Sequence, residues 1–176
     1  MLSVAALLIV QGTLGAFDTL YYHEYKARLP AGGAQTRGEL RLHALRDFIY
    51  AVLFCTLAFW AWNGALAWAL AGLIAAEIVI TMADFAIEKH SRAPDDLLPG
   101  ERLTHGVMAI IYGAMLGQLL PQAWLWADAA TGFGRHATPL PAPAAYLLVA
   151  MAVGVFASGV RDWLAATTSD DGCTAR

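Results

Sequence analysis

Apolar residues fill five long stretches of the chain, and short polar segments separate them. The stretches cover residues 2–25, 40–62, 64–89, 102–120 and 143–164. Each is close to the roughly 20 residues that an α-helix needs to cross about 30 Å of hydrocarbon. None alternates between apolar and polar positions, so helices are the spanning form that fits. The pattern predicts an all-α integral membrane protein whose single domain, residues 1–176, is an up-and-down bundle of five transmembrane helices.

The composition supports this prediction. Hydrophobic residues make up 59% of the 176 residues, charged residues make up only 14%, and the mean hydropathy is +0.53. A soluble domain covers its surface with more charge than this. The net charge of −3 is small and indicates no nucleic-acid partner. Cys55 lies in an apolar stretch and Cys173 near the C-terminus, so the two cysteines indicate no disulfide framework.

Basic residues gather in two predicted loops, between the first and second helices and between the third and fourth. By the positive-inside rule both loops are cytoplasmic, which places the N-terminus outside and the C-terminus inside. The segment 121–143, rich in proline and glycine, is then an outer loop. We expect a multi-pass protein of the inner (plasma) membrane that contacts the lipid bilayer and keeps its first apolar stretch as a span. The basic residues of the two loops are Lys26, Arg28, Arg37, Arg41, Lys89, Arg92 and Arg102.

Small residues recur at helix-packing intervals in the last two stretches, at Gly106, Gly113 and Gly117 and at Gly154 and Ser158. Such positions let helix backbones approach closely in lipid, where no hydrophobic force draws helices together. We expect them to pack helices, and the same faces would support a homo-oligomer.

Four of the stretches carry polar residues at helical spacing, near the ends predicted to be cytoplasmic. Lipid does not tolerate such faces, so all four are expected to point inward and converge on one site. The segment 83–106, which contains the end of the third helix, the following turn and the start of the fourth helix, carries residues of two of the faces. The faces are Gln11, Gly15, Asp18, Tyr22 and Tyr25; Glu39, His43, Asp47 and Tyr50; Glu77, Thr81, Asp84 and Glu88; and Glu101, His105, Met108 and Tyr112.

The depth of some of these acids favours a metal site. Glu77 lies 12 residues before Lys89 and therefore about 18 Å inside the predicted boundary. Carboxylates and imidazoles on facing helices repel one another or take up protons unless a cation joins them. One or two divalent ions would balance the charge, with ligands typical of iron, manganese or zinc. The simpler alternative is ion pairing with Arg46, Arg92, Arg102 and Arg161, or snorkelling to water, which suits Glu39, Glu88 and Glu101 near the interface.

The spacing assigns a role to each candidate. We expect His43, Asp47, Asp84, Glu88, Glu101 and His105 to bind metal, most simply two iron ions, with zinc or manganese as alternatives. Glu77 and Asp18 would be deeper ligands or proton carriers, and Tyr22, Tyr50 and Tyr112 would donate hydrogen bonds or electrons. His23 and Glu24 lie off the Asp18 face of a straight helix, so they would join the site only if the helix unwinds there, and we expect His23 to be solvated at the interface.

The layout is similar to that of the ferritin-like di-iron carboxylate bundles, in which acidic helices and Glu/His pairs face inward. The similarity covers four of the five stretches and extends to architecture alone. Those bundles use Glu-x-x-His, whereas this chain has Glu39-x-x-x-His43 and Glu101-x-x-x-His105, so ligand roles are not transferred.

The function predicted from these patterns is a metal-dependent membrane enzyme, a di-iron oxidoreductase that acts on a lipid-like or other apolar small-molecule substrate at the cytoplasmic side. A zinc-dependent membrane hydrolase is a variant of this hypothesis. A divalent-cation transporter or channel subunit is the main alternative, but the second and fourth stretches have little polar lining in their outer halves. A non-catalytic assembly protein whose acids form ion pairs is the third.

Overall fold

In the computed structural model the chain is a bundle of long helices, described here over residues 1–91 and 99–168, without the side chains of residues 88–91. Its elements are α1 (Leu2–Phe17), which continues into the π-helix η1 (Asp18–Lys26), the 3₁₀ turn η2 (Leu29–Ala31), α2 (Arg37–Leu57), β1 (Trp60–Asn63), α3 (Ala65–Ser91), α4 (Pro99–Ala127), β2 (Gly132–Arg135) and α5 (Ala142–Thr168).

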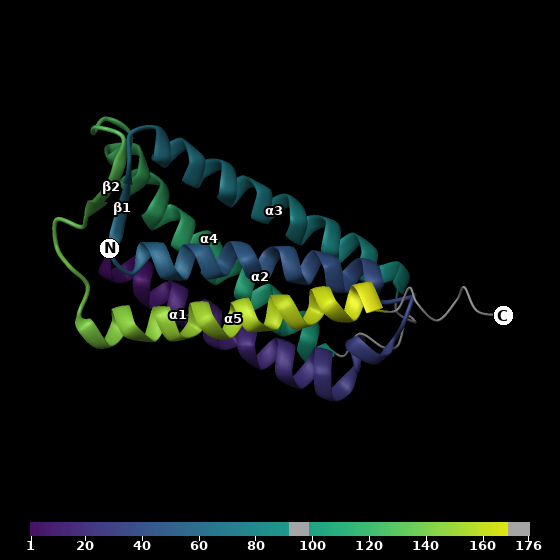
Figure 1. Ribbon diagram of the computed structural model, residues 1–176. Helices are drawn as coiled ribbons and strands as arrows, with labels where there is room; N and C mark the ends of the chain where they lie inside the picture. The colour runs from purple at the N-terminus through teal and green to yellow at the C-terminus, as the bar shows by residue number, and fades with distance from the viewer. Residues whose placement is uncertain (92–98, 169–176) are drawn as a thin grey trace.

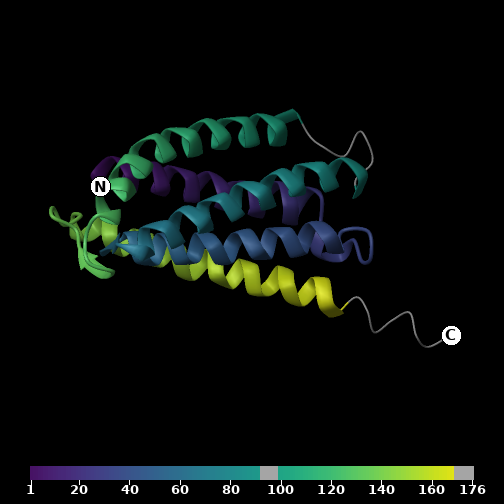
Figure 2. The same ribbon diagram turned by 90° about the horizontal axis from the view of Figure 1, so that it is seen from above.

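The long helices run side by side, with β1 and β2 at the end of the bundle where the chain begins (Figures 1 and 2). The π-helix, the start of α4 and the end of α5 lie at the opposite end. Helix α5 packs chiefly against α2, and α1 packs against both α4 and α5. All four predicted polar faces therefore belong to one end of a single bundle.

The helical class predicted from the sequence is confirmed. Four helical segments in the described part of the chain are long and apolar enough to cross a membrane: Leu2–Lys26, Ala65–Ile87, Pro99–Ala127 and Ala142–Thr168. Helix α2, at 21 residues, is long enough too, but Arg37, Glu39, Arg41, Arg46 and Asp47 make its first half strongly charged. The architecture is compatible with a membrane protein. The crossing of α2 and the orientation of the termini stay predictions.

Two boundaries differ from the expected ones. The second apolar stretch does not stay helical to residue 62, because α2 ends at Leu57 and β1 follows from Trp60. The fourth helix continues past Pro121 to Ala127, into the segment expected to be an outer loop. A proline lacks the N–H that its turn would use, but it does not stop a helix whose neighbouring turns remain bonded.

A small antiparallel sheet closes the end of the bundle where the chain begins. β1 pairs with β2 in a register that places Trp62 opposite Phe133 and Asn63 opposite Gly132. Gly64 follows with φ of +59°, a left-handed conformation that favours glycine, and its N–H donates to the Trp126 carbonyl at 2.9 Å. This turn, held by the end of α4, fixes where α3 begins.

His136, just after β2, ties this sheet to α2. Its Nε2 donates a hydrogen bond to the carbonyl oxygen of Leu57, the last residue of α2, at 2.9 Å. The ring is 6% exposed and stacks on Trp126 with 5.8 Å between ring centroids. Burial lowers the pKa of His136 below its ordinary 6.5, so the ring is neutral in the folded protein at neutral pH. It therefore acts as a neutral cap on a carbonyl at the end of a helix.

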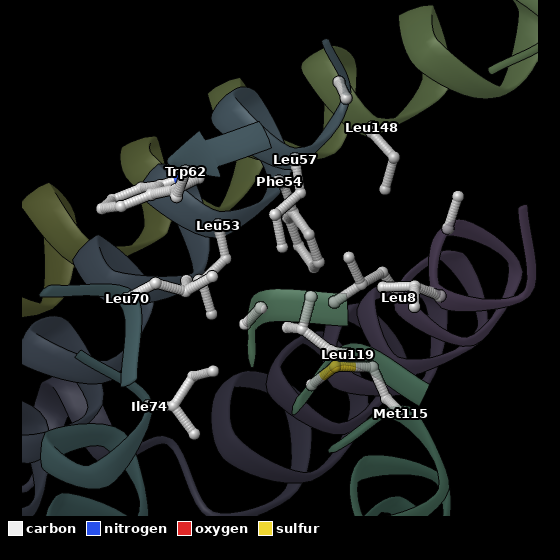
Figure 3. Close-up of a cluster of buried hydrophobic side chains, with 14 of the residues drawn as sticks. Leu8, Leu53, Phe54, Leu57, Trp62, Leu70, Ile74, Met115, Leu119 and Leu148 are labelled. Carbon is white, nitrogen blue, oxygen red and sulfur yellow. The ribbon is translucent and has the colours of Figure 1, made fainter. Parts of the chain in front are cut away.

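The half of the bundle next to this sheet has an apolar core (Figure 3). Its largest fully buried side chains come from every long helix: Leu8 of α1, Leu53 of α2, Leu70 of α3, Leu119 of α4 and Leu148 of α5. The buried acids come from the middle of these helices or from their opposite ends: Asp18, Glu39, Glu77, Asp84, Glu101 and Asp162. His23 and His43 lie with them, whereas His136 lies next to the sheet. The bundle thus has an apolar half and a polar half.

The predicted packing role of the α4 glycines is not seen within the chain. A Cβ at Gly106, Gly113 or Gly117 would meet nothing within 4 Å. Close packing is found instead at Gly12, where a Cβ would lie 3.0 Å from Phe54, and at Gly159, where it would lie 3.0 Å from Asp47. The homo-oligomer expected from the small-residue faces stays a prediction.

Candidate metal centre

The π-helix at the end of the first helix shapes the polar half. Its backbone is bonded from each N–H to the carbonyl five residues earlier, as in the 2.8 Å bond from Ala27 to Tyr22. Residues five apart therefore point in nearly the same direction, whereas in an α-helix they diverge by about 140°. Asp18 and His23 are five apart, and both are buried. The expectation that His23 is solvated is therefore wrong, because the unwinding that would bring it into the site is present.

Asp18, His23 and His105 form a compact group of ligand atoms that could hold a metal ion. Asp18 Oδ2 lies 3.1 Å from His105 Nε2 and 3.4 Å from His23 Nε2. One ligand atom from each of the three residues lies within 4.8 Å of the other two. An ion about 2.1 Å from each of its ligands holds them about 3.0–3.4 Å apart, which is close to these separations.

A fourth possible ligand, Glu101, lies next to this group. Glu101, in the first turn of α4 and 1% exposed, has Oε1 3.5 Å from His23 Nε2. Glu101 and His105 are four residues apart and so lie on one face of α4. Phe85 of α3 stacks on the other side of the His105 ring, with 5.3 Å between centroids, and fixes its orientation. The group therefore draws its ligands from η1 and α4, with α3 as a supporting wall.

A second cluster lies directly beside the first. His43 Nε2 of α2 lies 3.0 Å from Asp84 Oδ2 of α3, and Arg46 Nη1 donates to the same oxygen at 3.4 Å. The His43 ring stacks on the His23 ring with centroids 4.5 Å apart and an interplanar angle of 11°. The two clusters are therefore in van der Waals contact through their imidazoles.

Two carboxylate oxygens of these clusters are left without hydrogen bonds. Asp18 Oδ1 and Asp84 Oδ1 are buried, and neither has a hydrogen-bond partner among the described residues. Leaving a buried acceptor unsatisfied costs about 1–3 kcal/mol, and more for a charged group. Either oxygen could accept a metal ion or a proton.

Glu77 lies two helical turns before Asp84 on α3, in a separate layer. Its Oε1 accepts a hydrogen bond from Thr81 Oγ1 at 2.9 Å, and its side chain is 3% exposed. It lines a cavity of about 130 Å³ together with Tyr50, Tyr112 and His105. The rings of Tyr50 and Tyr112 are 6.3 Å apart. The cavity thus connects the Glu77 carboxylate and the two phenols to His105, at the edge of the group formed by Asp18, His23 and His105 (the metal group).

The structure brings together only some of the predicted ligands. His105 and Asp18 lie in the metal group, Glu101 borders it, and His43 and Asp84 form the adjacent cluster. Tyr22, expected to donate a hydrogen bond, is 8% exposed, and its hydroxyl lies against Gly100 at the start of α4. The side chain of Glu88 lies outside the described residues.

Asp47 is placed differently from the prediction. It follows His43 by one turn, yet it packs against Gly159 of α5 and lines a groove between α1 and α5 that His43 does not line. Helix α2 lies between α3 and α5, so two side chains one turn apart can lean toward different neighbours. The four-residue spacing alone did not indicate this.

Sequence reasoning gave too little weight to three buried residues. His23 was assigned to the interface. Glu39 was given an interfacial role, but it is completely buried one turn before His43. Asp162 of α5 was not considered, and it is 3% exposed with Arg161 Nη2 donating to it at 2.8 Å. Asp162 lay outside the four faces compared, and only its position in an apolar stretch could have indicated its burial.

Arginine pairing accounts for part of the polar half. Arg46 reaches Asp84, and Arg161 pairs with both Glu24 and Asp162. The ion-pair alternative therefore holds for these acids. It does not explain the Asp18 oxygen that has no hydrogen-bond partner among the described residues, or the convergence of three possible metal ligands, Asp18, His23 and His105.

The comparisons with known proteins add no assignment. No protein-family model, curated protein or solved structure matches this chain. Its function is therefore argued from the site itself.

Proposed function

We propose that this protein is a metal-dependent membrane enzyme, an iron oxidoreductase whose metal is bound by Asp18, His23 and His105. The observation that carries the proposal is the convergence of one carboxylate and two imidazoles in a buried site, across a π-helix that is needed to bring two of them together. π-Helical turns are rare and are found frequently at functional sites. Two histidines and one carboxylate with open positions are the ligand set of non-haem iron oxygenases.

A second ion is proposed at the adjacent cluster. His43 Nε2 and the open Asp84 Oδ1 would be its ligands, with Glu39 and Glu101 as neighbouring carboxylates. The stacked rings of His23 and His43 keep the two positions close, as a di-iron centre requires. Arg46 contacts only Oδ2 of Asp84, so its pairing leaves the other oxygen available.

The chain's own residues would handle protons around the metal. Glu77, with Tyr50 and Tyr112 beside it, lines the cavity that reaches His105, so protons or electrons would pass between this layer and the metal group. A bound iron ion would supply the oxidation chemistry, and the protein would supply an apolar surrounding that excludes water.

The closed apolar half supports an enzyme over a conduit. A transport path needs polar or hydrated lining through the whole membrane thickness. In the described residues, the half next to the sheet is filled by leucines of all the long helices, such as Leu53, Leu119 and Leu148, each with no exposed surface. A site that opens only at one end of the bundle suits a substrate that enters from one leaflet of the membrane. We propose that this is the cytoplasmic leaflet.

The proposal is tested by the metal content of the purified protein. We expect iron to co-purify, or to bind anaerobically after chelation, with up to two ions per chain, and His23→Ala and His105→Ala to lose it. His136→Ala is the matched control, since His136 is also a buried histidine but lies in the apolar half.

Three results would change the assignment. One zinc per chain held by the same residues would favour the hydrolase alternative, in which zinc activates water. Metal flux into proteoliposomes that His43→Ala abolishes would favour a transporter. Protein that binds no metal under any of these conditions would leave a cluster of ion pairs.

A further inference from the structure

A groove separate from the small cavity lies between α1 and α5. It has a volume of about 650 Å³ and is floored by residues of α2, including Phe54. This volume is in the usual range for small-molecule sites. Several of its lining residues, such as Leu20 and Gly154, are exposed, so the groove opens on the outside of the bundle.

Small residues keep the groove open along its length. They come from both walls, and larger side chains at the same positions would fill the space. A Cβ at Gly154 would meet nothing within 4 Å, which shows that the helices do not close over this position. Small residues in membrane helices usually serve close packing, but here they border a cavity. The residues are Gly15, Ala16, Gly154, Ala157 and Ser158, whereas Gly12 also lines the groove but packs closely against Phe54.

The two ends of the groove differ in polarity. One end is lined mainly by apolar side chains, among them Phe54, Met151 and Val155, with Gln11 and Thr13 as polar members. The other is lined by two acids and two bases, Glu24, Asp47, Arg46 and Arg161. Glu24 and Arg161 lie about 12 residues from Gly12 and 7 from Gly154 along their helices, so the polar end is on the order of 10–18 Å from the apolar one.

The charges at the polar end are balanced. Arg161 pairs with Glu24 and also holds the buried Asp162, and Arg46 pairs with Asp84. A ligand with a net negative head would face Glu24 and Asp47, and a cationic head would face the two arginines. A neutral head that both donates and accepts hydrogen bonds matches this pattern, since guanidinium groups donate and carboxylates accept.

The polar end also borders the candidate metal centre. Arg46, at this end, lines both the groove and the small cavity that reaches His105, and Tyr50, Met108 and Gln11 do so farther along the groove. The groove and the cavity that reaches His105 thus share part of their walls.

We propose that this groove binds a single-chain amphiphile with an uncharged, hydrogen-bonding head, such as a long-chain alcohol. Its chain lies between α1 and α5, and its head lies at Arg46 and Asp47. The proposal names the substrate class of the proposed enzyme and rests on that function for its chemistry, whereas the binding itself requires no metal.

The test uses the full-length protein in mild detergent and three probes of equal chain length: hexadecanol, hexadecanoate and hexadecyltrimethylammonium. Binding is measured by native mass spectrometry and by displacement of a fluorescent chain probe. We expect one hexadecanol per chain, bound at least about tenfold more tightly than either charged probe.

A paired substitution locates the site. Gly154→Leu places a side chain in the groove without meeting protein atoms within 4 Å of its Cβ, and we expect it to weaken hexadecanol binding at least about tenfold. Gly113→Leu is the control, because its Cβ also has open space but Gly113 lines neither cavity. Equal binding of the three probes, or binding that Gly154→Leu does not weaken, would show that the groove takes up bulk lipid only and would overturn the proposal.

The groove proposal and the metal proposal can be refuted independently of each other. The His105→Ala protein should still bind hexadecanol, because His105 does not line the groove. Iron binding without selective hexadecanol binding would remove the groove proposal and leave the metal proposal standing. Selective hexadecanol binding without any metal would do the reverse.

Discussion

The substitution Asp18→Asn distinguishes a metal centre from a cluster of ion pairs, because the two arrangements predict stability changes of opposite sign. Asp18 is 2% exposed, and its Oδ2 lies within 3.4 Å of both His23 and His105. Glu101 approaches the same His23 nitrogen at 3.5 Å. The two carboxylate oxygens are therefore no more than about 7 Å apart. Asparagine keeps the shape of the side chain and removes its charge.

The magnitude follows from this separation. Two like charges about 7 Å apart repel by roughly 2 kcal/mol at an effective dielectric constant near 20. If the histidines are neutral in the metal-free protein, Asp18→Asn removes this repulsion and stabilises the metal-free fold by roughly that amount. Iron at 100 times its dissociation constant should stabilise the wild type by about 2.7 kcal/mol and the variant by nearly nothing.

Ion pairing predicts the reverse. If His23 and His105 are protonated partners of Asp18, removing one member of a buried pair costs about 3–5 kcal/mol, because the remaining charges are left without compensation. Iron would then have no effect on either protein.

The assay is thermal unfolding in detergent, after chelation and again with Fe(II) added under anaerobic conditions. For a chain of this size roughly 2 kcal/mol moves the midpoint by about 4–8 °C. Asp162→Asn is the control, because Asp162 is also buried but is held by Arg161, with Nε at 3.0 Å and Nη2 at 2.8 Å. We expect it to lower the midpoint and to leave the iron shift unchanged. A metal-free Asp18→Asn protein that is less stable than the wild type, together with a wild type that iron does not stabilise, would refute the reasoning.

Three further predictions concern the apolar half. His136 has a lower pKa in the folded protein than in the unfolded chain, so below pH 6.5 the unfolded chain takes up a proton first and the stability of the fold decreases. The unfolding midpoint should therefore fall more steeply on acidification in the wild type than in His136→Gln. Gly64→Ala should lose at least about 1 kcal/mol of unfolding free energy, because φ is +59° and the new Cβ would clash with Thr131; an unchanged denaturation midpoint would contradict this. Leu119→Ala should lose about 2–5 kcal/mol by leaving a cavity while iron content stays at the wild-type level, as elemental analysis would check.

The helices and the convergence of their polar faces were predictable from the sequence, because both follow from regular spacing. Apolar stretches of the right length predicted the long helices, and acids at intervals of four and seven residues predicted which faces turn inward. Asp18, His43, Asp84 and His105 come together in the structure as expected from these faces.

The features of the fold and site that could not be predicted depend on departures from regular helical spacing. An α-helical projection separates Asp18 from His23, and only the change to five-residue hydrogen bonding reunites them. Asp47 shares a face with His43 in projection, but α5 provides a second neighbour that the projection does not contain. The strand Trp60–Asn63 is too short to show alternation of apolar and polar residues. Its pairing with Gly132–Arg135 also depends on a segment about 70 residues away, which local spacing does not indicate.

The division of the bundle into an apolar half and a polar half has a consequence for its dynamics. Amide protection against hydrogen exchange should be greatest around Leu53 and Leu119, and lowest at the π-helix and the first turn of α4, where few apolar contacts hold the backbone. The polar end could then open locally, exchange an ion or a proton and reclose while the leucine layers keep the helices in register. Such a protein would remodel its reactive end without passing through global unfolding.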